Sequence, residues 1–411
     1  MKFIKTPVKG MNDFLPADMA LREYVLSVIK QTYKGFGFSQ IETPVMEHIE
    51  NLQSNQGGEN EKLIFKVLKR GEKLNVAAAQ QEADVVDSGL RYDLTLPLAR
   101  YYANNAEQLC SPFKALQIGN VFRADRPQKG RFRQFMQCDI DILGDDSMLA
   151  ETELVLATTT LLLKLGFRGF KVRVNDRRIL KAMADYCSFA PEQLSKVFIS
   201  LDKLDKIGPQ GVEQELLLNG FAPEQVQKYL ALFLNRDGQT CTELCANLGS
   251  FLAPGIAEGL DRLIADIKAT GGDFEFTFDP TLVRGMGYYT GTIFEIEMAG
   301  LGCSVAGGGR YDKMIGNFGA NPTPACGFSI GFERIITILK DQGFTPPETP
   351  GGIAVLVDKK AEPAAVSAAF AKAGQQRAQG VRVTVLKRGK NAKRQKEQLT
   401  ALGYNEIQEV F

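Results

Sequence analysis

Two strand-like runs joined by a basic loop are the feature of this 411-residue chain that most limits its fold. The first run, FKALQIGNV, ends at Val121, and the second extends from Phe132 to Leu143. The connecting segment, RADRPQKGRFR at residues 123–133, holds five basic residues and one acidic residue. Strands connected in this way form an antiparallel hairpin. We therefore predict a long hairpin with a strongly positive tip.

Helices and short strands surround this hairpin in the sequence. Residues 16–34 place apolar side chains at helical spacing, which predicts an amphipathic helix. A strand that ends at Pro44 is predicted next, and residues 88–102 indicate a short strand and turn followed by a helix. A further helix is predicted over residues 147–165.

A helical segment then separates two β-rich parts of the chain. Asn175 and Asp176 are good helix caps, and the pattern from there to about Gly272 is helical, which predicts a helical insertion. β signals return over 273–297. The run Gly307–Gly309 lacks the spacing of a phosphate loop, so we interpret it as a tight turn. A final strand and helix follow in ACGFSIGFERIITILKDQGF.

A linker rich in proline and glycine at residues 346–352 precedes a short C-terminal unit. Residues 353–411 alternate strand and helix, which predicts a small α/β module. Between Arg382 and Lys396 this module holds seven basic residues and no acidic one. Such a run is either a solvated surface or a contact to an RNA backbone.

Composition excludes several classes of protein. We find no long apolar run and no pattern of a secretory signal, so neither a membrane span nor a signal peptide is expected. Seven scattered cysteines argue against a disulfide framework and favour the cytoplasm. Cys241 and Cys245 are interpreted as small buried side chains, because zinc requires further ligands. The net charge of +1 gives no argument about a polyanionic partner.

The chain has a single histidine, His48, which limits the chemistry available to it. Most schemes in which histidine acts as a general base, activates a nucleophile or binds a metal are removed. His48 itself is predicted to lie on the surface. Catalysis must therefore depend on arginine, lysine, carboxylates, tyrosine and backbone groups.

Several arginines stand where an anionic ligand would explain them. The guanidinium groups of the hairpin loop match phosphate oxygens bidentately, and Phe135 adds a surface on which a base can stack; the alternative is a solvated loop. Arg284, in LVRGMGYYTGTIFE, follows an apolar run and needs an anionic partner. In GFSIGFERI, Gly327 and Gly331 permit close backbone approach, and Arg334 begins a helix.

These segments together resemble the histidyl-tRNA synthetases over about residues 8–340. The helix and strand ending in ETPV resemble motif 1 of class II aminoacyl-tRNA synthetases, NVFRADRPQKGRFRQFMQCDIDILG resembles motif 2, and CGFSIGFERI resembles motif 3. RPQKGRFRQF, LVRGMGYYTG and AGGGRYD are similar to histidine-specific signatures of that family. The resemblance implies an α+β fold, with a class II synthetase antiparallel sheet flanked by helices, a helical insertion and a small C-terminal α/β module.

The resemblance also implies an activity and a domain organisation. Members of this family are histidine–tRNA ligases, which activate histidine with ATP to histidyl-adenylate and transfer it to tRNA-His. Residues 1–175 and 273–345 would form the two parts of the catalytic domain, 176–272 the helical insertion, and 353–411 a short anticodon-binding-like module. The implied partners are tRNA-His, histidine, ATP with Mg²⁺ and a second copy of the chain, which would bind through residues 16–46.

The ATP-binding roles of the family carry over by position. Arg123 would hold the α-phosphate of ATP. Arg334 would stack on adenine and reach the γ-phosphate with Arg131, and Phe135 would cover the other face of adenine. Arg284 would bridge the histidine carboxylate and the α-phosphate, because a fixed cation offsets the repulsion between two anions. Arg284 and Arg123 are thus the expected catalytic residues, and Mg²⁺ would neutralise the remaining phosphates.

Six further positions match the histidine-binding residues of the family: Asp93, Thr95, Gln137, Asp141, Tyr289 and Tyr311. The first three would hold the α-ammonium group, the last three would surround the imidazole, and Arg284 would hold the carboxylate. A carboxylate and a phenol on the two ring nitrogens would select imidazole, because other rings would leave buried polar groups unpaired.

Contacts to tRNA are implied at two places. Arg126 and Lys129, in the hairpin loop, would contact the acceptor end. Arg388, Lys390 and Lys393, in the C-terminal module, would contact the RNA backbone. No metal-ligating residues are expected.

The sequence departs from the family pattern at several positions. Asp93 and Asp141 stand where glutamates are usual, Gly287 where an aspartate often precedes the two tyrosines, and Met136 where many members have histidine. The short C-terminal module leaves two alternatives open: a non-catalytic histidine-binding regulatory subunit of ATP phosphoribosyltransferase, and an enzyme that adenylates histidine but delivers it elsewhere. Retention of the four arginines placed for ATP and the carboxylate favours the ligase.

Overall fold

The structure is a computed structural model that describes residues 3–54, 60–127, 130–233, 239–285, 287–298, 304–347 and 351–411. Contacts between residues divide the chain into two compact units. One comprises Met1–Asp13 and Val25–Asp341, and the other comprises Phe14–Tyr24 and Gln342–Phe411.

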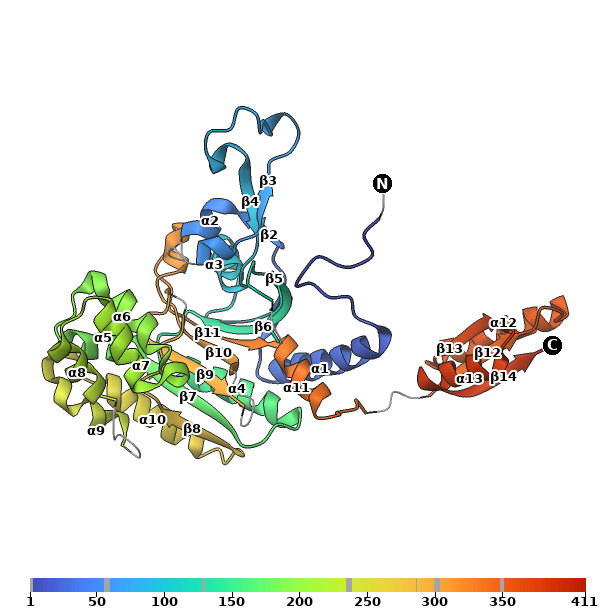
Figure 1. Cartoon of the computed structure of the whole chain (residues 1–411). Helices are drawn as coiled ribbons and strands as arrows, with labels where there is room; N and C mark the ends of the chain where they lie inside the picture. Colours follow the sequence, from blue (N-terminus) through green and yellow to red (C-terminus); the bar gives the residue numbers. More distant parts are fainter. Residues whose placement is uncertain are drawn as a thin grey trace. The chain divides into compact units, whose positions relative to one another are not determined.

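The larger unit is built on an eight-stranded sheet with the order β1-β5-β6-β11-β10-β9-β7-β8 (Figure 1). Its strands are β1 Ser39–Ile41, β5 Phe113–Phe122, β6 Gln134–Leu143, β7 Phe170–Asp176, β8 Phe274–Phe278, β9 Thr292–Glu297, β10 Ser304–Arg310 and β11 Ala325–Gly331. Neighbours from β5 to β7 in this order are antiparallel, whereas the edge pairs β1–β5 and β7–β8 are parallel. The predicted antiparallel sheet is confirmed.

The predicted hairpin is formed by β5 and β6, which pair along their full length. Backbone hydrogen bonds fix the base of its basic loop. The amide of Arg123 donates to the carbonyl of Arg133 at 2.9 Å, and the amide of Arg133 donates to the carbonyl of Gly10 at 2.8 Å. The amide of Ala124 donates to the carbonyl of Leu63 at 2.8 Å. The start of the loop is therefore held by two other backbone segments.

Helices pack on the large sheet and close its apolar core. They are the part of α1 Pro16–Gly35 that begins at Val25, α3 Thr95–Asn105, α4 Leu149–Lys164 and α11 Phe332–Asp341. α4 contacts β6, β11 and the helix α10 Ile256–Lys268, and α11 contacts β6 and β10. α4 is apolar on most of its surface, and Leu154, Leu161 and Leu162 are fully buried, as expected for a helix enclosed by a core. No helix within the described ranges is both long enough and apolar enough to cross a membrane.

A second, three-stranded sheet precedes the hairpin. Its strands are β2 Met46–His48, β3 Lys66–Leu68 and β4 Val86–Leu90, in the antiparallel order β2-β4-β3. Helix α2, Ile49–Ser54, and the turns η1 Asn60–Leu63, η2 Gly71–Lys73, η3 Glu82–Asp84 and η4 Ala106–Gln108 complete this region. His48 is exposed, as predicted. The strand predicted to end at Pro44 is shorter, since β1 and its pairing with β5 end at Ile41.

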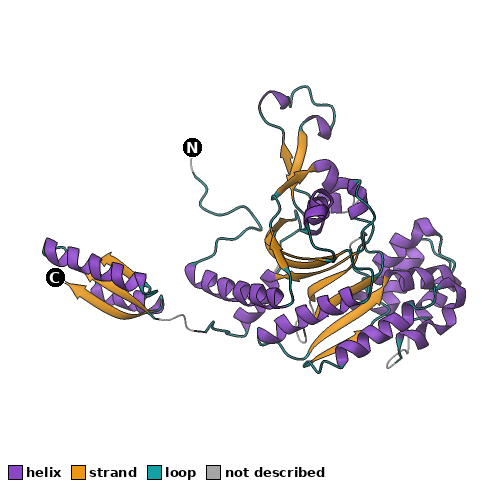
Figure 2. Cartoon of the chain, turned by 180° about the vertical axis from the view of Figure 1, so that it is seen from behind, coloured by secondary structure: helices purple, strands orange, loops and turns teal. Residues whose placement is uncertain are grey.

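The helical insertion is confirmed between β7 and β8, where Figure 2 shows a group of helices. It contains α5 Arg177–Tyr186, α6 Leu194–Leu201, α7 Leu204–Leu218, α8 Pro223–Ala231, α9 Cys241–Cys245 and α10 Ile256–Lys268, with the turns η5 Pro191–Gln193 and η6 Ala246–Phe251. Asp176 caps α5 by accepting the amide of Arg178 at 2.8 Å. Cys241 and Cys245 are buried, and the described part of the chain has no cluster of three metal-ligating side chains.

The run Gly307–Gly309 lies inside β10, so the predicted tight turn is wrong. β10 pairs with β9 on one side and β11 on the other. A Cβ at Gly308 would lie 2.0 Å from the carbonyl oxygen of Gly327, and a Cβ at Gly307 would lie 2.4 Å from the guanidinium carbon of Arg284. These glycines are needed because a strand and an arginine approach closely, not because the chain turns.

The smaller unit contains the C-terminal α/β module, as predicted. Its strands β12 Gly352–Val357, β13 Val383–Lys387 and β14 Tyr404–Val410 form a parallel sheet in the order β13-β12-β14, connected by α12 Pro363–Ala378 and α13 Ala392–Ala401. Val355 and Ala373 belong to one apolar cluster, and Leu356 and Leu399 to another. Because neighbouring residues of β12 point to opposite faces, the two clusters cover the two faces of the sheet.

Candidate active site

β6 directs three polar side chains to one face of the large sheet. Side chains alternate along a strand, so Gln137, Asp139 and Asp141 share a face while Cys138 and Ile140 point the other way. The three polar residues are 8%, 3% and 2% exposed. Buried polar groups normally have hydrogen-bond partners. A row of them in the middle of a sheet therefore indicates a binding site.

Asp141 lies at one end of this row and is paired with a tyrosine. The hydroxyl of Tyr311 donates to Asp141 Oδ1 at 2.6 Å. Gly327, opposite Asp141 in the β6–β11 pair, makes room for this contact, since a Cβ there would lie 1.9 Å from the same oxygen. Burial raises the pKa of Asp141 to about 7, although the hydrogen bond from Tyr311 lowers it, and the nearby Asp93 raises it further. The Asp141 carboxyl group therefore changes its protonation state near neutral pH.

Three tyrosines form an aromatic wall beside Asp141. The ring of Tyr288 lies 4.9 Å from that of Tyr289 and 6.1 Å from that of Tyr311, both in edge-to-face arrangement. All three pack on the apolar cluster that contains Leu98 of α3 and Met314, which precedes the turn η7 Ile315–Phe318. The wall provides apolar surface together with phenol hydroxyls, which suits a flat polar ring.

Asp93 and Thr95 enter the site at the start of α3. Asp93 is buried, and its Oδ1 accepts the amide of Leu96 at 3.1 Å, so the carboxylate caps the first turn of the helix. Its charge acts on the pKa of Asp141 and on that of Tyr288, which places it in the same site. The side chain of Thr95 hydrogen-bonds to Tyr288.

Arg123 lies at the end of β5 between two aromatic rings. Its guanidinium carbon is 4.2 Å from the ring centroid of Tyr92 and 5.1 Å from that of Phe135. Its Nε donates to the carbonyl of Tyr92 at 3.1 Å. Arg131 is exposed, and its charge acts on the pKa of Tyr92, so the two arginines share one region. The arrangement orients the Arg123 guanidinium before any ligand binds.

Arg334 lies in the first turn of α11 and adjoins the hairpin loop. Its Nη1 donates to the carbonyl of Ser304, at the start of β10. A Cβ at Gly130 of the hairpin loop would lie 3.9 Å from Arg334 Cγ. The loop therefore lies against this arginine. Arg126 is exposed in the same loop, and Lys129 falls outside the described residues.

Arg284 occupies the connection between β8 and β9 with a φ of 60°, a conformation that non-glycine residues rarely adopt. Its Nη1 donates to Glu295 Oε2 at 2.7 Å, so an anionic partner is present as expected. Its Nε is buried and has no hydrogen-bond partner in the described part of the chain. Burial lowers the pKa of Arg284, but Tyr289 and Glu295 outweigh that effect and raise it. A buried N–H without a partner is suited to an anionic ligand.

Two further arginines hold the Arg284 connection to the helical insertion. Arg173 on β7 donates to Asp205 of α7 at 2.9 Å and lies 3.8 Å from Glu295. Arg177, the first residue of α5, donates to the carbonyl of Val283 at 3.3 Å. The insertion thus contacts the large sheet through Asp205 and the segment before Arg284 through Arg177.

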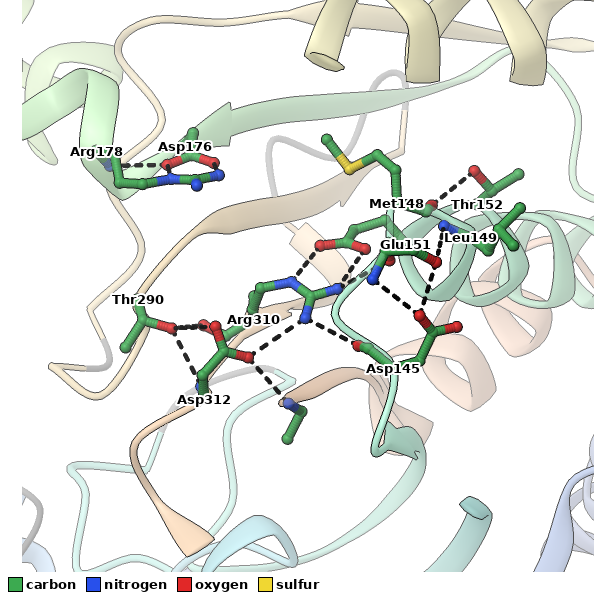
Figure 3. A network of polar contacts seen from close by, with 12 residues as sticks. Asp145, Met148, Leu149, Glu151, Thr152, Asp176, Arg178, Thr290, Arg310 and Asp312 are labelled. Atoms are coloured by element: carbon green, nitrogen blue, oxygen red, sulfur yellow. Dashed lines mark hydrogen bonds and ion pairs between the residues drawn. The ribbon is translucent and has the colours of Figure 1, made fainter. Parts of the chain in front are cut away.

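Arg310, next to Tyr311, belongs to a buried polar network (Figure 3). Its Nε and Nη2 donate to the two carboxylate oxygens of Glu151 at 2.6 and 2.7 Å. Its Nη1 donates to the carbonyl of Asp145 at 3.1 Å and to Asp312 Oδ1 at 3.3 Å. The Arg310 and Glu151 side chains are 8% and 1% exposed. This network joins α4 to β10 and holds the strand that carries Tyr311.

The comparisons with known proteins agree with this geometry. A family model described as histidyl-tRNA synthetase matches residues 10–335. The chain belongs to the histidyl-tRNA synthetase family. A histidine–tRNA ligase of Leifsonia xyli subsp. xyli (strain CTCB07) is 43% identical over 416 residues, which cover 97% of this chain and 94% of that protein. A probable histidine–tRNA ligase of Tropheryma whipplei (strain Twist) is 44% identical, with 87% and 85% covered.

Solved structures agree with the assignment to the histidyl-tRNA synthetase family. The crystal structure of histidyl-tRNA synthetase from Nostoc sp. PCC 7120 is 28% identical, with a TM-score of 0.79 over 99% of this chain and 91% of that one. A structure from Bacillus halodurans C, described as an ATP phosphoribosyltransferase regulatory subunit/histidyl-tRNA synthetase, has a TM-score of 0.79 at 19% identity, covering 100% and 99% of the two chains. At that identity the likeness concerns the fold alone.

In this member of the histidyl-tRNA synthetase family, the predicted site residues lie in two groups. One group surrounds the buried row on β6: Asp93, Thr95, Gln137, Asp141, Tyr289 and Tyr311. A second lies around the hairpin loop: Arg123, Arg131, Phe135 and Arg334. Asp139, Tyr288 and Glu295 were not among the residues predicted from the sequence. Strand alternation, which relates Asp139 to Gln137 and Asp141, would have revealed the first of them.

The basic residues of the C-terminal module differ in their surroundings. Arg388 donates to Glu409 at 2.9 Å and to Asp358 at 3.4 Å, and Lys396 lies 3.0 Å from Glu409. Lys390 and Lys393 are exposed. The run that lacks acidic residues in sequence therefore meets carboxylates from β14 and from the end of β12.

Proposed function

We propose that the protein is a histidine–tRNA ligase that activates histidine with ATP and transfers it to tRNA-His. The observation that carries the proposal is the buried Asp141–Tyr311 pair, on the same strand face as Gln137 and near Asp93. Together with the family assignment, this arrangement offers a carboxylate for an imidazole N–H at one end of the site and carboxylate and amide oxygens for an ammonium at the other.

Histidine recognition follows from these groups. Asp141 would accept one ring N–H, and the hydroxyl of Tyr289 would pair with the other nitrogen, with Tyr311 orienting Asp141. Asp93, Thr95 and Gln137 would hold the α-ammonium group. A ring without both nitrogens would leave the buried carboxylate unpaired, and such a mismatch typically costs a factor of about 10⁴ or more in discrimination.

The arginines would bind the phosphates of ATP. Arg123 would bind the α-phosphate, and Arg334 and Arg131 the γ-phosphate, with adenine between Arg334 and Phe135. In adenylation a carboxylate oxygen of histidine attacks the α-phosphorus and pyrophosphate leaves. Arg284 would lie between the two anions and stabilise the charge of the transition state. A terminal ribose hydroxyl of the tRNA then attacks the carbonyl carbon of the adenylate, and AMP leaves.

Mg²⁺ enters the proposal as the ion that accompanies ATP and neutralises its phosphates. Magnesium of this kind is usually held by phosphate oxygens, water and one or two carboxylates. Glu333, a buried carboxylate next to Arg334 in the first turn of α11, is the residue that would contribute.

The remaining assignments follow from the same family pattern. We assign residues 1–175 and 273–345 to the catalytic domain, 176–272 to the insertion and 353–411 to the tRNA-binding module. Arg126 and Lys129 would contact the acceptor end, and Arg388, Lys390 and Lys393 the RNA backbone. We expect a cytoplasmic homodimer formed through residues 16–46, since two-fold homodimers are the commonest assembly.

The function is tested by exchange of ATP with labelled pyrophosphate in the presence of each amino acid and excess Mg²⁺. Exchange is expected with histidine and not with the other amino acids, and a tRNA-His transcript should then be charged. The second candidate is a histidine-binding regulatory subunit of ATP phosphoribosyltransferase, for which the short C-terminal module at residues 353–411 is the one argument. If the protein binds histidine but supports no pyrophosphate exchange, the regulatory subunit becomes the favoured function in place of the ligase. Exchange without charging of the tRNA would favour an enzyme that delivers the adenylate elsewhere.

A further inference from the structure

Asp139 is a buried carboxylate that has no role in the proposed function. It lies in the middle of β6, opposite Gln117 of β5 and Ser329 of β11. Its side chain shares the face of Gln137 and Asp141, between them. Burial and the neighbouring Asp141 raise the pKa of Asp139 well above its ordinary value.

Its hydrogen bonding is incomplete. Ser329 Oγ accepts Gln137 Nε2 at 2.6 Å and hydrogen-bonds to the Asp139 carboxylate. Asp139 Oδ1 has no partner among the described residues, and the same holds for Gln137 Oε1 and Asp141 Oδ2. Buried acceptors without donors are costly, and native proteins seldom keep them without a ligand or water.

The three oxygens without partners indicate which donor groups a ligand of this site must present. All are acceptors on one face of one strand, and alternate residues of a strand are roughly 7 Å apart. A matching ligand must present several N–H donors at the Gln137–Asp139 end and one donor at the Asp141 end. An ammonium supplies three donors and no acceptor, and an imidazole N–H supplies one.

The charges around Asp139 agree with a cationic ligand. Asp93, Asp141 and Arg123 act on its pKa, and its own charge acts on Arg91. Asp139 also raises the pKa of Tyr288 and that of Tyr33 of α1. Arg91 is already committed, because it donates to the carbonyls of Thr43 and Asn120. When Asp139 is ionised, three carboxylates lie near two guanidinium groups, so a cationic ligand would stabilise the ionised form of Asp139.

We propose that Asp139 binds the α-ammonium group of histidine together with Asp93 and Gln137. The inference rests on the proposed function for the identity of the amino acid. Histidine would lie along β6, with its ammonium at Gln137 and Asp139 and its ring at Asp141. Asp139 would lose its proton when the ammonium binds, so histidine affinity should rise with pH more steeply in the natural protein than in a variant without this carboxylate.

The test uses Asp139→Asn and three ligands: histidine, histidinol, which keeps the ammonium and lacks the carboxylate, and imidazolepropionate, which lacks the ammonium. The Kd of histidinol and the KM of histidine in pyrophosphate exchange should rise roughly 10- to 100-fold, as expected for a lost hydrogen bond between charged groups. The Kd of imidazolepropionate and the KM of ATP should change less than about twofold. Asp146→Asn, the same change at an exposed position, should alter none of them.

The outcomes separate the possible roles of Asp139. An equal loss for histidinol and imidazolepropionate, or no loss for either, would overturn the proposal and leave Asp139 a structural residue. Thermal unfolding of the ligand-free protein checks folding, and Asp139→Ser replaces Asp139→Asn if the latter does not fold. Calorimetry with histidinol needs no ATP, so its result stands apart from whether the natural protein supports exchange. If the natural protein shows no exchange but Asp139→Asn selectively loses histidinol binding, the ligase proposal is contradicted and this inference still holds.

Discussion

Groups of the protein itself hold Arg284 in place before any substrate binds. Its backbone adopts a positive φ, its Nη1 is paired with Glu295, and its guanidinium lies against the space left by Gly307. Preorganisation of this kind is what makes a charge effective in a transition state, because no energy is spent on orienting it during the reaction.

We expect Arg284→Ala to lower the rate of histidine-dependent pyrophosphate exchange by roughly 10²- to 10³-fold, the effect typical of removing one preorganised charge. Circular dichroism and unfolding temperature should stay close to those of the natural protein. Arg262→Ala, which removes an exposed arginine of the insertion helix α10, serves as the control. Near-normal exchange in Arg284→Ala would show that this arginine is only structural.

Asp141 should make the stability of the ligand-free protein depend on pH. Its pKa is about 7 in the folded state, against an ordinary value of 3.8. A raised carboxyl pKa means that the folded state holds the proton more tightly, so the contribution to stability is complete below about pH 4 and is lost as pH rises through 7. Asp141→Asn should therefore gain stability relative to the natural protein between pH 5 and pH 8. Urea midpoints at the two pH values measure this, and an equal difference at both would contradict it.

At the scale of elements, the Arg310–Glu151 pair joins α4 to β10 across the core. Both side chains are nearly inaccessible, and the two parallel hydrogen bonds between them have good geometry. Burying such a pair contributes little net stability, but breaking it leaves one charge uncompensated. The consequence can be measured as a difference between single and double substitutions.

We expect Arg310→Met to destabilise the protein by about 3–5 kcal/mol, because Glu151 is left buried without its partner. The double substitution Arg310→Met with Glu151→Met should recover most of that loss, since no charge remains buried. Urea unfolding of the double variant and of both single variants, Arg310→Met and Glu151→Met, provides the values. A double variant as unstable as the sum of two single changes would refute a coupled pair.

At the scale of the whole molecule, the C-terminal module offers two kinds of cation. Arg388 and Lys396 are paired with carboxylates, whereas Lys390 and Lys393 are exposed. Exposed cations release counterions when they meet phosphates, which makes RNA binding strong at low salt and weak at high salt. The exposed pair should therefore contribute more to tRNA affinity than the paired residues.

Lys390→Ala with Lys393→Ala should raise the KM for tRNA several-fold at low salt and leave pyrophosphate exchange unchanged. The effect should shrink as salt is added, because it is electrostatic. Lys359→Ala with Lys360→Ala removes the same charge from another exposed part of the module and serves as the control. An unchanged KM at low salt would leave this run as a solvated surface.

The sequence alone determined much of the fold and most of the candidate site. The β5–β6 hairpin, the helical insertion and the C-terminal α/β module follow from local periodicity and short connections. The arginines and the positions proposed to bind histidine were expected from motifs that are contiguous in sequence. These are local properties, and a local pattern is visible before the chain folds.

Only the tertiary structure decided which distant residues meet. β10 lies between β9 and β11, and this neighbourhood explains Gly307–Gly309, which local pattern alone assigned to a turn. The same long-range pairing sets Asp139 beside Ser329 and brings Glu295 to Arg284, and in the C-terminal module the fold brings Glu409 to Arg388. Charge balance and hydrogen-bond satisfaction depend on such pairings, so buried acceptors without partners become visible only after the strands are placed.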